Sequence, residues 1–138
     1  KNLNNKKLDI FYLYHWGHAE KTYIDYIKKK YPDIVFPNII LIDLLSYFKN
    51  EPIIIKDAFN FSLKTIGKCL YKYKFINTTW SETDNGMDAM IKFKEICLNN
   101  KKNIPLKRYN DISNIIEYNK IDCIVLMEIL QFLRKQYL

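Results

Sequence analysis

The chain has 138 residues, of which 49% are hydrophobic and 15% aromatic, and this composition excludes a disordered chain. Its 22 Lys and Arg against 15 Asp and Glu give a formal net charge of +7, which suits a polyanionic partner such as nucleic acid. The same Lys excess also follows from the base composition of an AT-rich genome. No apolar run approaches the roughly 18 residues of a membrane span, so no membrane partner is expected.

The three cysteines are odd in number and show no CxxC spacing. Reduced, buried thiols in an intracellular protein are the expectation for such a set. The cysteines are Cys69, Cys97 and Cys123.

The first half of the chain predicts a strand, a helix and a strand. Residues 8–16 are rich in β-branched and aromatic side chains, typical of a strand buried on both faces. Gly17 ends this run, and a helix is expected from His18 to about Lys30. A second apolar run begins at Asn38 and predicts a strand that ends at Asp43, with a turn or short helix after it. This order is the unit of a parallel sheet.

The second half predicts helices joined by polar loops. Residues 51–56 fit either an edge strand or an extended loop. Ser62 is a favourable N-cap for a helix from Leu63 to about Tyr73. A further helix is expected from Gly86 to about Leu98, between a polar loop at 79–86 and a basic loop at 99–105.

The longest periodic segment runs from about Asp111 to Tyr137, with Asp111 or Ser113 as its cap. Its apolar residues recur mostly at three- and four-residue steps, which predicts a helix with one face in a core. They are Ile112, Ile115, Ile116, Ile121, Val125, Ile129, Leu130 and Leu133. The expected fold is α/β, with a short, mostly parallel sheet flanked by several helices and a long C-terminal helix. Residues 1–138 are expected to form a single domain.

Tyr118 and Asp122 lie four residues apart in this last segment and therefore stack on neighbouring helical turns. Aspartate is a poor helix former, and few structural reasons place one beside apolar residues. A carboxylate with a phenol one turn before it could hold a metal ion and a metal-bound water. The alternative is a helix surface that carries one Tyr and one Asp.

A second group of candidates lies where the first predicted strand meets its helix. Glu20 follows the end of that strand, and ligands of open α/β sheets bind beyond the carboxyl ends of strands. His15 and His18 could ligate a metal, but no third ligand is spaced to complete a zinc site, so His15 is expected to orient the junction or touch substrate. Asp43 is a third candidate acid, or a cap for the turn that follows it.

Phosphodiester hydrolysis is a reaction that requires such acids to converge. Two divalent ions about 4 Å apart can clamp an in-line displacement at phosphorus. Mg²⁺ and Mn²⁺ prefer carboxylate oxygens, and such a site needs about four carboxylates. Glu20 and Asp122 are the two that the sequence supports best, whereas Asp84 and Asp88 suit loop and capping positions.

The stretch Tyr118–Cys123 resembles the Y-x-x-x-D motif of the tyrosine branch of the DEDD 3′–5′ exonucleases, which have a ribonuclease-H-like fold. That family's second motif is an Asn followed five residues later by an Asp, and His15 and Glu20 have this spacing with different residues. Residues 14–20, 60–67 and 117–126 resemble, in order, the RecB-associated and giant-virus nucleases with this domain.

The resemblance implies a function and a set of roles. Glu20 and Asp122 would be ligands of two Mg²⁺ or Mn²⁺ ions, Tyr118 would position the attacking water, and His15 and Lys64 would contact a DNA or RNA substrate. The family's first motif, D-x-E, does not occur before His15. The resemblance therefore implies that the first three strands and two acids lie upstream of Lys1, in a larger parent chain, and that residues 1–138 alone are inactive.

Two other classes of function stay open at this point. A non-catalytic nucleic-acid-binding module would have an incomplete site and would use its basic loops for phosphate contacts. A structural partner domain is favoured if the basic residues are evenly scattered. A D-x-E motif on an upstream strand would favour the nuclease.

Overall fold

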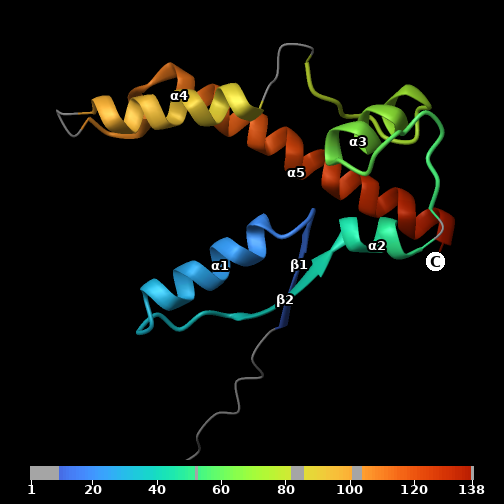
Figure 1. Cartoon of the computed structure of the whole chain (residues 1–138), viewed down its shortest axis with the longest axis horizontal. Helices are drawn as coiled ribbons and strands as arrows, with labels where there is room; N and C mark the ends of the chain where they lie inside the picture. The colour runs from blue at the N-terminus through green and yellow to red at the C-terminus, as the bar shows by residue number, and fades with distance from the viewer. Residues whose placement is uncertain (1–9, 52, 82–85, 101–103, 138) are drawn as a thin grey trace, which may run out of the picture. The chain divides into compact units, whose positions relative to one another are not determined.

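The computed structural model describes residues 10–51, 53–81, 86–100 and 104–137, and the chain divides into two compact units, Lys1–Leu63 and Lys64–Leu138 (Figure 1). The first unit contains β1 (Ile10–His15), α1 (Ala19–Lys30), β2 (Asn38–Asp43) and α2 (Leu44–Asn50). The second contains α3 (Leu63–Lys72), which begins at the boundary, α4 (Gly86–Asn99), the 3₁₀ turn η1 (Leu106–Arg108) and α5 (Asn110–Tyr137). The expectation of a single domain stays a prediction.

The first unit is built on two parallel strands. β1 and β2 pair in register from Ile10 opposite Asn38 to His15 opposite Asp43, and α1 is the helix that connects them (Figure 1). The predicted strand, helix, strand and following short helix are therefore confirmed. Because parallel strands bring their carboxyl ends to one edge, the last residues of both strands lie side by side there.

β1 is exposed for a strand so rich in apolar residues. Ile10 is 50% and Tyr12 60% exposed, while Tyr14 is half-buried and His15 is buried. The prediction of a strand buried on both faces is wrong, because a two-stranded sheet has too little structure around it to cover both faces. The expected short, parallel sheet is confirmed for the part of the chain that the structure describes, where β1 and β2 are its two strands.

A small apolar core holds α2 and the loop after it in place. Phe48 is fully buried and Trp16 packs on it, with ring centroids 5.2 Å apart. The Trp16 indole N–H donates to the carbonyl of Phe61 at 2.9 Å, which fastens the far end of the loop. Residues 53–62 form no helix or strand, so the extended-loop alternative for this region is the correct one.

The second unit is organised along α5. The predicted inward face is confirmed at Ile112, Val125, Ile129 and Leu133, all of which are buried. Ile116 is 58% exposed and was assigned to that face wrongly, because it projects from the helix beyond the apolar stripe. The helix begins at Asn110, so Asp111 and Ser113 lie inside it rather than capping it.

α3 and α4 form the rest of the second unit. α3 buries Ile66, Gly67, Cys69 and Leu70, and α4 packs along α5. Cys69 is the buried thiol that the sequence predicts, whereas Cys97 and Cys123 are exposed, so the expectation of buried thiols is wrong for these two. The ring of Phe75, just past α3, packs on Phe132 of α5 with centroids 5.1 Å apart. Among the helices that the structure describes, none combines the length and apolarity needed to cross a membrane.

Candidate functional site

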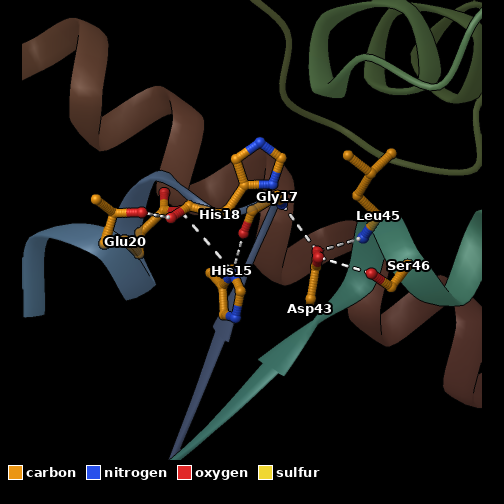
Figure 2. A network of polar contacts seen from close by, with 8 residues as sticks. His15, Gly17, His18, Glu20, Asp43, Leu45 and Ser46 are labelled. Atoms are coloured by element: carbon orange, nitrogen blue, oxygen red, sulfur yellow. Dashed lines mark hydrogen bonds and ion pairs between the residues drawn. The ribbon is translucent and has the colours of Figure 1, made fainter. Parts of the chain in front are cut away.

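The carboxyl ends of β1 and β2 are tied together through a glycine and an aspartate (Figure 2). Gly17 has a φ of +86°, a left-handed conformation that few other residues adopt without strain, and this turns the chain from β1 into α1. The backbone N–H of Gly17 donates to Asp43 Oδ1 at 2.8 Å. Gly17, which ends the first apolar run of the sequence, is therefore the residue that hydrogen-bonds the end of β1 to the end of β2.

Asp43 serves as the N-cap of α2. Its Oδ1 also accepts from the backbone N–H of Leu45 at 3.0 Å, and its Oδ2 accepts from the Ser46 hydroxyl at 2.8 Å (Figure 2). Of the two interpretations of Asp43, the cap is the one that the structure bears out. Burial raises the pKa of this carboxyl, but the hydrogen bonds, led by the one from Gly17, outweigh burial and hold the pKa below its usual value.

This lowered pKa makes the stability of the chain sensitive to acid. An unfolded aspartate titrates near pH 3.9, so the network stabilises the fold fully above about pH 4 and is lost as pH falls through the lower folded pKa. Asp43→Asn keeps a good cap but cannot titrate. We expect its urea-unfolding midpoint to fall less between about pH 5 and pH 2.5 than that of the wild type. Parallel pH profiles for the two proteins would contradict this.

His15 and Glu20 come together in the first unit. His15 is buried, its Nδ1 hydrogen-bonds the carbonyl of Gly17, and the same nitrogen lies 3.9 Å from Glu20 Oε2 (Figure 2). Glu20 lies in the first turn of α1 with its side chain 49% exposed. These contacts suit a histidine that orients the junction, and its contact with substrate stays a prediction.

Glu20 borders an open, mostly apolar hollow of about 410 Å³. The residues around it come from β1 and α1: Leu13, Ala19, Glu20, Tyr23 and Ile24. None of these side chains is cationic. A phosphate placed here would meet a carboxylate, so it would need a cation between the two groups.

The second unit gathers Tyr118 and Asp122 with a tryptophan. Both lie half-buried on α5, one turn apart. The indole N–H of Trp80 donates to Asp122 Oδ1 at 2.7 Å, although 42 residues separate them. Trp80 is itself only 3% exposed. The aspartate that breaks the apolar pattern of the helix therefore has a specific partner, and its carboxylate is oriented from outside its own helix.

Lys64 of α3 lies over the same aromatic pair. Its Nζ is 5.2 Å from the centroid of the Tyr118 ring and 5.8 Å from that of Trp80, within the range of cation–π contacts. Gly86, at the start of α4, lies so close to Tyr118 that a Cβ there would be 3.0 Å from the phenol oxygen. We call Lys64, Trp80, Tyr118 and Asp122 the α5 cluster.

The predicted site residues thus fall into two groups. The α5 cluster brings together Lys64, Tyr118 and Asp122, and the β1–α1 junction brings together His15 and Glu20. Glu20 lies in the first unit and Asp122 in the second, so their expected convergence stays a prediction. Among the residues described by the structure, no group of three His, Cys, Asp or Glu side chains could hold a metal ion. Asp84 lies outside those residues, and Asp88 lies in the first turn of α4, as expected for capping.

Sequence reasoning missed Trp80, which belongs to the α5 cluster, and Glu128, which supports it. Trp80 lies in a segment that the sequence predicts as a polar loop, yet a lone tryptophan among Thr, Ser and Glu residues is itself a signal of a buried role. Glu128, six residues after Asp122 on α5, accepts three hydrogen bonds from the segment before Trp80.

Comparison with protein-family models, with curated proteins and with solved structures gave no match to this chain.

Proposed function

We propose that this chain is the larger part of a ribonuclease-H-like, metal-dependent nuclease domain that hydrolyses phosphodiester bonds of DNA or RNA, as a 3′–5′ exonuclease. The observation that carries the proposal is that Tyr118 and Asp122 lie one turn apart on α5 and that the indole N–H of Trp80 donates to Asp122. The net charge of +7 supports a polyanionic substrate.

Glu20 and Asp122 supply the hard oxygen donors that Mg²⁺ and Mn²⁺ prefer, so their chemistry fits such ions even though their number is short of a full site. When bound, the ions would activate water and neutralise charge at phosphorus. Two further acids would come from elsewhere in the full-length protein. Glu20 beside an apolar hollow with no cationic side chain fits a carboxylate that meets phosphate through a metal ion.

Each remaining residue has one role in this proposal. Tyr118 would hold the attacking water by a hydrogen bond from its hydroxyl. Lys64, at 5.2 Å from the Tyr118 ring, would place a positive charge beside the scissile phosphate. His15 would keep the turn at Gly17 in shape and so fix the direction of Glu20.

A second function, a nucleic-acid-binding module without catalysis, is favoured by one observation. The described part of the chain holds no group of three acidic or other metal-ligating side chains. Such a module would bind phosphates through its lysines and arginines, with strong salt dependence and no dependence on Asp122.

Tyr118→Phe in the full-length protein separates the two functions. The ring and its contact with Lys64 stay, and only the hydroxyl is lost. We expect single-turnover cleavage in Mg²⁺ or Mn²⁺ to fall by about one to three orders of magnitude, the range for lost positioning and stabilising groups. Nucleic-acid affinity in Ca²⁺ should hardly change, because phosphate contacts supply most of it.

Tyr109→Phe is the matched control, because the Tyr109 hydroxyl donates to Asn100 at 3.2 Å within the same unit and is not in the α5 cluster. Its cleavage rate should equal that of the wild type. Equal cleavage by wild type and Tyr118→Phe would make Tyr118 an ordinary packed tyrosine. A wild-type protein that binds nucleic acid without cleaving it would establish the binding module instead.

A further inference from the structure

The segment that follows α3 is fastened to α5 by one carboxylate. Glu128 Oε2 accepts from the backbone N–H groups of Asn77 and Thr78, each at 2.9 Å, and Oε1 accepts from the Thr78 hydroxyl at 3.1 Å. Hydrogen bonds to an ionised carboxylate are about twice as strong as neutral ones. Because three donors converge on it, Glu128 fixes both the position and the direction of the chain at Thr78.

Trp80 lies two residues after this anchor. One face of α3 presses on its ring, since a Cβ on Gly67 would lie 2.9 Å from Trp80 Cζ3 and 2.8 Å from Val125 Cγ1. A rigid indole that is packed in this way, on a segment that Glu128 anchors two residues earlier, has little freedom to turn. Its N–H therefore points in one direction, and the group found there is Asp122 Oδ1 at 2.7 Å.

We propose that Glu128 and Trp80 are positioning residues for Asp122, acting in series: Glu128 holds the segment at Thr78, this segment presents Trp80, and Trp80 orients the carboxylate that would bind the metal ion. The proposal rests on the proposed function. It assigns Glu128, an acid on the same helix as Asp122, to holding the chain and not to the metal. Partners that orient a ligand carboxylate are typically worth about 10- to 100-fold in metal affinity or activity.

The hydrogen bond itself is tested first, in metal-free full-length protein with ¹⁵N-labelled tryptophan. The indole N–H resonance of Trp80 is the one that disappears in Trp80→Phe. We expect this resonance to shift in Asp122→Asn and in Glu128→Gln, and to stay in place in Glu117→Gln, a change at an exposed acid of the same helix. A resonance that does not move in Glu128→Gln would overturn the serial arrangement.

The consequence for the metal is tested by titration with Mn²⁺, followed by electron paramagnetic resonance of the free ion. Trp80→Phe and Glu128→Gln should bind Mn²⁺ about 10- to 100-fold more weakly than the wild type. The control is Ile129→Val, which deletes one methylene at a fully buried position next to Glu128. It lowers stability but removes none of the hydrogen bonds that link Glu128, Thr78, Trp80 and Asp122. It should keep wild-type Mn²⁺ affinity.

Two outcomes of this titration test the positioning role separately from the nuclease. Unchanged Mn²⁺ affinity in both variants would overturn the positioning role. If both variants bind Mn²⁺ more weakly than the wild type, and the wild type itself does not cleave nucleic acid, the positioning role is supported and the nuclease is overturned. If Trp80→Phe does not fold, Thr78→Val removes only one of the three donors to Glu128 and should give a smaller loss in the same direction.

Discussion

Gly67→Ala is expected to destabilise the second unit, although helix propensity alone predicts the reverse. Alanine in a helix interior is favoured over glycine by about 1 kcal/mol. At Gly67, however, the added Cβ would lie 2.8 Å from Val125 Cγ1 and 2.9 Å from Trp80 Cζ3, closer than packed carbon atoms approach. Overpacking of a core typically costs about 1 to 3 kcal/mol, and both neighbours here are buried. The free energy of unfolding, measured in urea, should therefore fall.

A double-mutant cycle with Val125→Ala tests whether crowding against Val125 causes this loss of stability. Val125→Ala alone leaves a cavity, but combined with Gly67→Ala it makes room for the new methyl group. The two changes should therefore cost less together than the sum of their separate costs. Additive costs would show that crowding against Val125 is not the reason. Lys68→Ala, at an exposed neighbouring position of α3, should leave stability nearly unchanged.

The sequence predicted the elements whose signals are local. The apolar run before Gly17, the run that ends at Asp43 and the apolar period of α5 each gave an element with bounds close to the observed ones. The sequence predicts that the first strand ends at Gly17, and the φ of +86° at this residue supplies the physical reason. Local patterns suffice here because strand and helix each impose a fixed period on their buried side chains.

The contacts that define the α5 cluster are of another kind. Trp80 and Asp122 are 42 residues apart, and Thr78 and Glu128 are 50 apart, so no local pattern links them. The sequence marked Tyr118 and Asp122 through their spacing and through an aspartate that breaks an apolar stripe. It did not mark which side chain would meet that aspartate, because the choice depends on how α3 and the segment after it pack on α5. Ile116 was misplaced for a related reason, since periodicity alone does not show how wide the covered stripe is.

Among single substitutions in the α5 cluster, Asp122→Asn should have the largest effect on cleavage. The substitution keeps the shape of the side chain and leaves an oxygen to accept from Trp80, but it removes the negative charge that a divalent cation needs. We expect single-turnover cleavage by the full-length protein to fall by about 10³-fold or more, at or beyond the upper end of the range for a single lost transition-state donor. Unfolding in urea should change little, because the hydrogen-bonded geometry is retained.

Glu117→Gln is the control that isolates this charge. Glu117 lies five residues earlier on α5 and pairs with Lys120 at 3.1 Å, and both side chains are 60% exposed. Exposed pairs of this kind contribute about 0 to 1 kcal/mol, so the fold should be unaffected. Both variants lose one negative charge from the same helix, and their general attraction for nucleic acid changes equally. Only Asp122→Asn should lose cleavage. If the two variants cleave at the same rate, Asp122 is a structural hydrogen-bond partner of Trp80 and binds no catalytic metal.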